Sequence, residues 1–229
     1  MVRMEHVIPA VIFRQSFMEN TQKTPRRRPP RFELTGDLLC LDFVNTLDNR
    51  PSSEPKELLE YYVDLARFAE DTGILAPHQA DQLVERSALM PDEAQRTLRY
   101  AVELREALYA VLAALMKKQP APAMALVRLN GFVQHAAQHA RLVESGARLE
   151  WRFDDPTSSL DAPLWAIARS AADLLASDQM AFVRACSSKT CQWLFLDTSK
   201  NHRRRWCDMK LCGNRAKGQR FYRRKKSGK

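Results

Sequence analysis

Two short cysteine motifs near the end of the chain decide its organisation. The first is Cys186-Ser-Ser-Lys-Thr-Cys191 and the second is Cys207-Asp-Met-Lys-Leu-Cys212, and 15 residues separate them. Zinc(II) binds four thiolates in a tetrahedron, and two equally spaced pairs can close around one ion from opposite sides. Four unrelated core cysteines would not predict equal spacing in both pairs. We therefore expect one structural Zn²⁺ held by these four cysteines, with no position left for a catalytic water.

Disulfide bonds are the alternative use of such cysteines. The apolar run at residues 7–13 is interrupted by Arg14 and is not followed by a clear small-residue cleavage site. No apolar run approaches the roughly 20 residues that span a bilayer. We therefore favour reduced thiols that bind zinc, and we expect a cytoplasmic protein with no membrane segment.

The charge of the chain is divided unevenly. The net charge is +9, from 36 Lys and Arg against 27 Asp and Glu. Fifteen of the basic residues and only two of the acidic ones follow Val183, so this segment carries +13 and the rest carries −4. Basic segments bind polyanions because they release the counterions that phosphates condense. A solvated basic tail is the alternative interpretation.

The part of the chain before the cysteines is predicted to be a mainly helical domain at residues 32–180. A basic, proline-rich stretch before it predicts a disordered arm at residues 1–31. Apolar residues recur at helical spacing over several segments. These segments are residues 57–72, 77–89, 91–118, 123–142 and 163–177.

Two segments of this domain do not follow the helical pattern clearly. Residues 148–153 alternate between apolar and charged side chains, which predicts a strand. Residues 38–47 are apolar almost throughout, so they are expected to be buried as either a strand or a helix.

Three polar residues lie inside the apolar run at residues 38–47. Asp42, Asn45 and Thr46 need internal partners if this run is buried. They either pin a turn or line a small-molecule pocket. The pocket would also be the place for an enzyme active site, but we find no nucleophile–base pair and no catalytic metal pattern. We therefore expect that the protein is not an enzyme.

The cysteine segment, residues 181–229, is predicted to fold around the metal. Residues 192–202 suggest a short hairpin that packs Trp193 and Phe195 over the site, and residues 216–226 suggest a basic helix. The second cysteine pair would lie at the start of this helix, as in treble-clef fingers. A module of this size has little core, so zinc would supply most of its folding free energy.

Basic and amide side chains of this segment are candidates for contacts to nucleic acid. Arginine fits phosphate and the guanine edge, and asparagine fits the adenine edge. Asn214 and Arg215 are the candidates for base contacts; alternatively, Asn214 caps the helix and Arg215 braces Asp197 or Asp208. The full candidate set is Arg203, Arg204, Arg205, Lys210, Asn214, Arg215, Lys217, Arg220, Arg223 and Arg224.

Two segments of the chain resemble known protein families. The segment from Cys186 to Lys217 resembles the CGNR zinc finger, through Trp193, Phe195, Asp197, Ser199, Arg204-Arg-Trp-Cys207, Met209 and Cys212-Gly-Asn-Arg215. Asp208 departs from the pattern, since a serine is more usual there, and its charge could weaken one phosphate contact. The stretch Leu41-Asp-Phe-Val-Asn-Thr46 resembles the ABATE domain that precedes this finger. The resemblance covers about residues 32–226.

Together these observations predict an α+β protein. Its mainly helical N-terminal domain carries a small sheet and is followed by a small treble-clef-like four-cysteine zinc finger. The resemblance implies a bacterial, stress-induced transcription regulator whose finger binds DNA. A small-molecule effector of the N-terminal domain and a homodimer are further candidates. The alternatives are an RNA-binding zinc protein, in which Trp193, Trp206 and Phe221 stack on unpaired bases, a thiol-based redox sensor, and a protein-interaction module.

Overall fold

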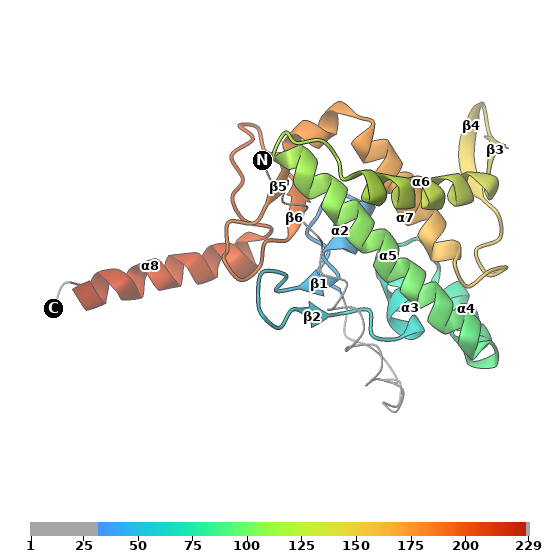
Figure 1. The fold of residues 1–229 in the computed structure, drawn as a ribbon, viewed down its shortest axis with the longest axis horizontal. Coiled ribbons are helices and arrows are strands. Elements are labelled where there is room, and N and C mark those ends of the chain that lie inside the picture. The colour runs from blue at the N-terminus through green and yellow to red at the C-terminus, as the bar shows by residue number, and fades with distance from the viewer. Residues whose placement is uncertain (1–31, 228–229) are drawn as a thin grey trace, which may run out of the picture.

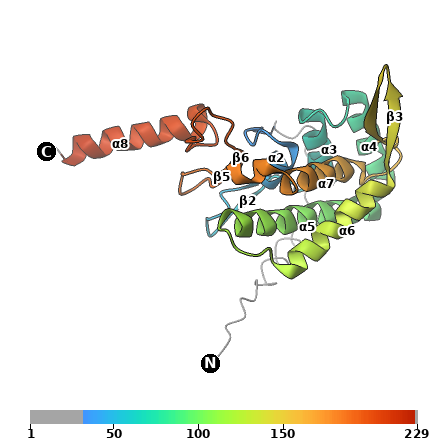
Figure 2. The ribbon, with the colours of Figure 1, turned by 90° about the horizontal axis from the view of Figure 1, so that it is seen from above.

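The computed structural model describes residues 32–227, and the expected arm at residues 1–31 lies outside this range. A helical body lies at one end of the molecule, and a single long helix, α8, extends from the other (Figure 1). The turned view shows the same separation between α8 and the body (Figure 2). The predicted α+β class, mainly helical with small antiparallel sheets, is confirmed.

The body contains helices joined by short connections and two small hairpins. Its elements are α2 (Leu39–Val44), β1 (Leu47–Asp48), β2 (Lys56–Glu57), α3 (Tyr62–Asp71), α4 (Pro77–Leu89), α5 (Pro91–Met116), α6 (Ala123–Gln138), β3 (Ala140–Ser145), β4 (Arg148–Phe153) and α7 (Ala162–Leu175). The cysteine segment follows with η1 (Asp178–Phe182), β5 (Val183–Ala185), β6 (Leu194–Leu196), η2 (Met209–Gly213) and α8 (Asn214–Ser227).

The core of the body forms where α2, α3, α5 and α7 meet. Helices α4 and α5 each begin with a proline, which is favoured in the first turn because its missing N–H would have no partner there. The apolar stripe of α5 packs inward, with Leu104 and Leu108 fully buried. Trp165 of α7, Phe43 of α2 and Phe68 of α3 are the largest apolar side chains of this core. The short helix α2 therefore lies at the centre of the body rather than at its edge.

Two predicted segments differ from the structure, and one segment that was left open can now be assigned. Residues 38–47, left open between strand and helix, contain the buried helix α2 (Leu39–Val44) and, after a turn, the first residue of β1. The helix expected from residue 57 begins at Tyr62, because residues 56–57 pair with β1, and the Asp64 carboxylate accepts the N–H groups of Glu60 and Tyr61. The helix expected to continue to residue 142 ends at Gln138, because β3 begins at Ala140 and pairs with β4.

The predicted strand at residues 148–153 is confirmed as β4. It pairs antiparallel with β3 from Ala140↔Phe153 to Ser145↔Arg148. The two-residue turn between them places Gly146 at φ 61°, a conformation that glycine adopts without steric cost. This hairpin projects from the end of the body farthest from α8 (Figures 1 and 2).

The cysteine segment is docked on the body through β6. Alternate side chains of this strand face two different cores. Leu194 and Leu196 belong to the hydrophobic core of the body, whereas Phe195 belongs to the cluster that contains the four cysteines. A single short strand therefore joins the two cores.

Candidate metal centre and nucleic-acid interface

The first cysteine pair lies in the loop of a hairpin. Strand β5 pairs antiparallel with β6, from Val183↔Leu196 to Ala185↔Leu194. The Cys186 N–H then donates to the carbonyl of Trp193, at 2.8 Å, and the Cys191 N–H donates to the carbonyl of Ser188, at 3.2 Å. These bonds close the loop, and the sulfur atoms of both cysteines lie in one cluster with those of the second pair. The hairpin thus encloses the first pair, whereas the sequence suggested a hairpin within residues 192–202.

The second pair lies at the start of the terminal helix, as predicted. Cys207 is fully buried, and Cys212 lies in η2, one residue before Gly213. The Asp208 carboxylate caps this turn by accepting the N–H groups of Lys210 and Leu211. The unusual acidic residue therefore acts as a helix cap, a role that serine also fills well.

The four thiols form a compact cluster. Their sulfur atoms all lie within 4.8 Å of one another, with 3.6 Å between Cys191 and Cys207 and 3.7 Å between Cys207 and Cys212. Tetrahedral zinc with Zn–S bonds of about 2.3 Å requires sulfur atoms about 3.8 Å apart. The cluster fits one structural zinc ion. Among the described residues, this is the one group of potential ligands found close enough together to hold a metal.

Aromatic side chains close the cluster from the solvent. Phe195 is fully buried against the cysteines, and Trp193 and Trp206 pack on it while remaining partly exposed. The packing expected of Trp193 and Phe195 is thus found. An apolar shell of this kind limits the access of water and competing ligands to a bound ion.

The four thiols lie close enough to hydrogen-bond with one another. Hydrogen bonds with Cys191 and Cys207 lower the pKa of Cys186. Hydrogen bonds with Cys186 and Cys207 raise the pKa of Cys191. A thiolate at one position is stabilised by thiols at the others, so the four protons do not leave independently. Zinc would replace the remaining protons, and its affinity would therefore fall as the pH is lowered.

A buried carboxylate organises the loop between the two pairs. Asp197 is 1% exposed, and it accepts the N–H groups of Ser199, at 3.1 Å, and Arg204, at 2.9 Å. Burial raises the pKa of Asp197, but the hydrogen bond from the Ser199 hydroxyl and the two N–H bonds together outweigh burial, and the pKa lies below its usual range. Asp197 therefore acts as a negatively charged hub of the loop.

Arg204 is the one candidate contact that the structure places differently. Its guanidinium lies 4.4 Å from the centroid of the Phe195 ring and donates to the carbonyl oxygens of Trp206 and Cys207. It also reaches the body, where it pairs with the Asp37 carboxylate and donates to the carbonyl of Thr35. Its bonds are directed to the protein, so we correct its assignment from nucleic-acid contact to connector between finger and body.

Most of the other candidates are exposed. Arg215 lies at the first turn of α8 and does not brace Asp197 or Asp208 through any hydrogen bond found here. The guanidinium of Arg205 lies 5.6 Å from the centroid of the Trp206 ring. Arg224 lies in α8, but its side chain is outside the described part. The exposed candidates are Arg203, Arg205, Lys210, Asn214, Arg215, Lys217, Arg220 and Arg223.

The three polar residues of α2 and its end bind protein groups. Asn45 is 4% exposed and makes two bonds to β6, one from its amide to the Leu194 carbonyl, at 2.9 Å, and one from the Leu194 N–H, at 2.8 Å. The Thr46 hydroxyl donates to the Phe43 carbonyl, at 2.7 Å. The Asp42 carboxylate accepts the Gly36 N–H, at 2.7 Å. This geometry corresponds to pinning rather than to a ligand pocket, and Asn45 ties the body to the finger.

The loop at residues 35–37 completes this connection. The Leu196 N–H donates to the Gly36 carbonyl, at 3.0 Å, while Asp37 holds Arg204. A Cβ atom at Gly36 would lie 2.8 Å from the backbone nitrogen of Asp42, so glycine permits the close approach. We call the set Gly36, Asp37, Asn45, Leu194, Leu196 and Arg204 the clasp.

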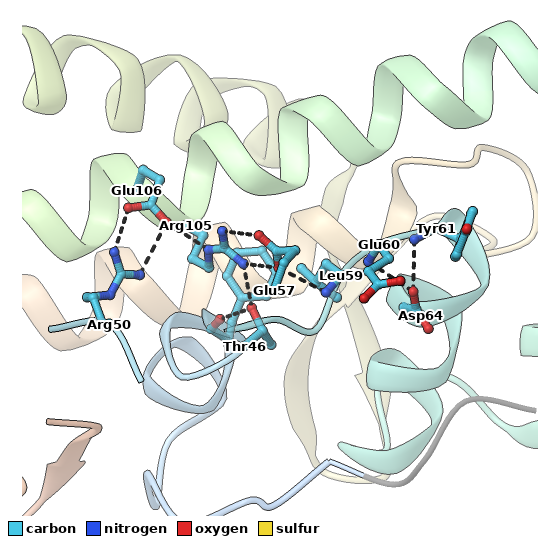
Figure 3. Close-up of polar contacts among 10 residues, drawn as sticks. Thr46, Arg50, Glu57, Leu59, Glu60, Tyr61, Asp64, Arg105 and Glu106 are labelled. Carbon is cyan, nitrogen blue, oxygen red and sulfur yellow. Dashed lines mark hydrogen bonds and ion pairs between the residues drawn. The ribbon is translucent and has the colours of Figure 1, made fainter. Parts of the chain in front are cut away.

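A buried ion-pair network, not assigned a role from the sequence, holds the β1–β2 hairpin against α5 (Figure 3). Arg105 is 2% exposed and pairs with Glu57 through two bonds, of 2.6 and 2.7 Å. It also donates to Glu106, at 2.9 Å, and Glu106 in turn accepts two bonds from Arg50. The sequence contained one indication of this network: Arg105 lies within the apolar stripe of α5, and a buried cation needs negatively charged partners.

The described helices give no sign of a transmembrane segment. None of them combines the length and the apolar character that crossing a bilayer requires.

Comparison with known families agrees with this geometry. A family model described as "putative stress-induced transcription regulator", the ABATE model, matches residues 37–178. The CGNR zinc finger model matches residues 183–225 and thus includes all four cysteines. No curated protein matches the chain. Because the first model spans more than half of the sequence and the second follows it directly, the chain belongs to the ABATE family and carries a C-terminal CGNR zinc finger.

Proposed function

We propose that this protein is a DNA-binding transcription regulator that works by binding and not by catalysis. The observation that carries the proposal is the arrangement of α8. This helix follows directly after η2, which carries Cys212 of the cysteine cluster; it contacts little else than η2 and extends away from the body (Figures 1 and 2). Its position makes it accessible to a large partner on several sides.

The composition of α8 favours a polyanionic partner. The helix contains no acidic residue, and basic residues lie on all sides of it. Such a helix gains little from its own side-chain pairs, because like charges three or four residues apart repel each other. Contact with phosphates would remove this repulsion and release condensed counterions. Its basic residues are Arg215, Lys217, Arg220, Arg223, Arg224, Lys225 and Lys226.

Two kinds of contact are expected. Arg203, Arg205 and Lys210 lie close to the cysteines in the sequence and are exposed, so we expect them to bind phosphates. Asn214 and Arg215 begin the helix, where side chains reach base edges when the end of a helix enters the major groove. Asp197 and Arg204, which hold the loop between the two cysteine pairs, would keep this end of α8 in position. The family description supports a regulator and a response to stress, and the target sequence would follow from selection on random duplexes.

The direct test is duplex binding by the full zinc-loaded chain across a salt series. The variant Arg215→Ala/Arg220→Ala should weaken binding at least about tenfold and reduce the magnitude of the salt slope by about two. The matched control is Arg96→Ala/Arg99→Ala, which removes the same charge from the exposed side of α5. Equal losses in both double variants would indicate unspecific attraction by net charge and would overturn the assignment to α8.

RNA is the second candidate partner. Phe221 and Tyr222 are 63% and 71% exposed on α8 and are free to stack on unpaired bases. Trp193 and Trp206, the other predicted stacking residues, pack on the metal cluster and are less available. Competition of duplex DNA with structured RNA at equal salt decides between the partners. Preference for RNA, lost in Phe221→Ala, would overturn the DNA assignment.

A further inference from the structure

The β3–β4 hairpin presents an apolar surface to solvent. Leu142, Leu149 and Trp151 are 53%, 63% and 58% exposed and share one face of the hairpin, because Leu142 lies opposite Trp151 and Leu149 opposite Glu144. Phe153 continues this face into the body, where its ring lies 6.2 Å from that of Trp165. The guanidinium of Arg169 lies 5.1 Å from the Trp151 ring centroid and supports it from α7. Exposed apolar strands of this kind usually have a partner.

The outer edge of β4 is able to pair with another strand. The sheet contains only β3 and β4 among the described strands, so β4 has no neighbour on its other side. The Asp154 N–H donates to the His139 carbonyl. In an antiparallel ladder every second residue bonds to the same neighbour, so the backbone groups of Arg148, Glu150 and Arg152 also face β3. The backbone groups of Leu149, Trp151 and Phe153 therefore point away from β3 and toward solvent. A second strand could bond to these residues without disturbing the hairpin.

The charges along β4 are complementary to a second copy of the same strand in one register. We propose that two copies of the chain associate through β4 in an antiparallel, two-fold ladder centred on Trp151. In this register Glu150 lies opposite Arg152 of the second copy, and Arg148 lies opposite Asp154. Leu149 lies opposite Phe153, and the two Trp151 rings are neighbours on the apolar face.

The neighbouring registers are unfavourable. A shift of the centre to Glu150 places Glu150 opposite Glu150 and Arg148 opposite Arg152, and a shift to Arg152 places Arg152 opposite Arg152 and Glu150 opposite Asp154. In both shifted registers, every pair of charged residues that lie opposite each other within residues 148–154 has the same sign. In the registers that lie between these, each apolar residue of one copy would lie opposite a charged residue of the other, because neighbouring residues of a strand point to opposite faces. The sequence of β4 thus selects one two-fold arrangement.

The edge of β3 offers no comparable match. Centred on Leu142, a β3 ladder would place Arg141 opposite Val143 and Ala140 opposite Glu144, so no opposite charges would pair. Pairing of β3 with β4 of another copy would leave free edges at both ends and produce open chains rather than a closed dimer. The second copy therefore docks through β4. This association does not depend on nucleic acid and goes beyond the proposed function.

The test is the association of the full zinc-loaded protein, measured by sedimentation equilibrium after nucleic acid has been removed. Arg152→Glu and Glu150→Arg should each weaken dimerisation at least about tenfold, because each change places two like-charge pairs across the two-fold axis. The double variant Glu150→Arg/Arg152→Glu exchanges both partners and should restore the wild-type dimer. Arg96→Glu, on the exposed side of α5, is the control for a change in net charge.

A melting experiment separates folding from association. Within the hairpin, Arg152 lies opposite Arg141 and pairs with the Glu150 carboxylate of its own strand at 3.7 Å, so Arg152→Glu removes one repulsive and one attractive contact. These side chains are exposed, and the free energy of folding should therefore change little. A melting temperature that is unchanged or raised, together with a weaker dimer, supports the interface. A monomer at all concentrations, or a dimer that both single variants leave intact, would overturn it. Capture of a different protein by a monomeric hairpin would do so as well.

Discussion

At the scale of the residue, Arg105 illustrates how one buried charge fixes a local structure. Burial lowers the pKa of Arg105, but the charges of Glu57 and Glu106 outweigh it and raise the pKa above its ordinary value. The side chain thus remains charged and holds the β1–β2 hairpin against α5. Removal of one partner from such a network leaves the others uncompensated.

Arg105→Ala should lower the free energy of unfolding by about 3 kcal/mol, because Glu57 and Glu106 lose their shared cation. Arg99→Ala, on the exposed side of the same helix, should change it by less than about 0.5 kcal/mol. Urea unfolding followed by circular dichroism measures both. Equal effects of the two substitutions would show that the network does not contribute to stability.

Asp42 provides a prediction on pH. Burial raises the pKa of Asp42 to about 6, above the value of 3.8 for an exposed carboxyl, and the bonds from the loop at residues 35–37 only partly offset this. The folded state therefore binds the proton more tightly than the unfolded state. The stability that this group supplies is complete below the unfolded pKa and is lost as the pH rises through about 6.

Asp42→Asn keeps an acceptor for the Gly36 N–H but removes the titration. Between pH 5 and pH 7, the stability of the variant relative to the wild type should rise by about 1 kcal/mol. Comparison of the two proteins at each pH cancels the titration of the thiols, which both share. A difference that stays constant over this range would contradict the raised pKa.

At the scale of the element, β6 is the strand on which the arrangement of the molecule depends. Its two leucines lie in the body and Phe195 lies against the metal cluster, while Asn45 bonds to both backbone groups of Leu194. The finger is consequently held at a strand that the body both buries and hydrogen-bonds. Loss of a clasp bond should weaken the connection more than it weakens metal binding.

Asn45→Ala should lower the free energy of unfolding by about 2 kcal/mol, because Leu194 would keep a buried N–H and C=O without partners. It should also increase amide hydrogen exchange in β6 and retain one zinc per chain. Asn130→Ala, an exposed change on α6, is the control. Unchanged exchange in β6 would contradict the role of the clasp.

The elements differ in how much of them the sequence could predict. Helices α4 and α5 start at prolines and follow clear apolar stripes, so their positions were predicted closely. Helix α2 could not be assigned, because a short run buried on all sides has no periodicity. The docking of the finger also escaped prediction: Asn45 and Leu194 are 149 residues apart, and no local pattern reports such a contact.

The site could be predicted only in part. The equal spacing of the two cysteine pairs was sufficient to predict the metal ligands, since the ligands of a four-cysteine site are close in sequence. The contact of Arg204 with the body could not be predicted, because Arg204 lies between two other arginines and local sequence does not distinguish its side chain from theirs. Only the position of Asp37 and Phe195 in space distinguishes it from Arg203 and Arg205.

At the scale of the whole molecule, two surfaces lie at opposite ends. Helix α8 extends from one end, and the β3–β4 hairpin projects from the other (Figures 1 and 2). A partner on one surface would not cover the other. A dimer through β4 would therefore leave both basic helices accessible, and paired fingers would predict target sites with two-fold symmetry.

The cysteines should differ in reactivity according to their surroundings. Burial raises the pKa of Cys40 to about 11, so this thiol should resist alkylation in the folded protein. After removal of zinc, four thiols per chain should react rapidly and Cys40 should react only on unfolding of the body. Mass spectrometry after timed alkylation measures this order. Rapid reaction of Cys40 would show that the body unfolds together with the finger.

The same experiment bears on oxidation as a signal. The four cysteines of the cluster are at most 6% exposed, so a bound zinc ion would be shielded from small oxidants. Release of zinc by mild peroxide, with loss of duplex binding, is the result that a redox sensor predicts. Retention of zinc under these conditions would contradict that alternative.

The central claim is that zinc fixes the start of α8 and thereby creates the nucleic-acid-binding surface. The most direct test measures duplex affinity at one salt concentration for the zinc-loaded protein, the chelated protein and Cys207→Ser, with Cys40→Ala as the control that retains all four ligands. We predict that chelation and Cys207→Ser each weaken binding at least about tenfold, that zinc restores the chelated protein alone, and that Cys40→Ala binds like the wild type. Equal affinity with and without zinc would contradict the account, because the basic sequence would then bind without the folded finger.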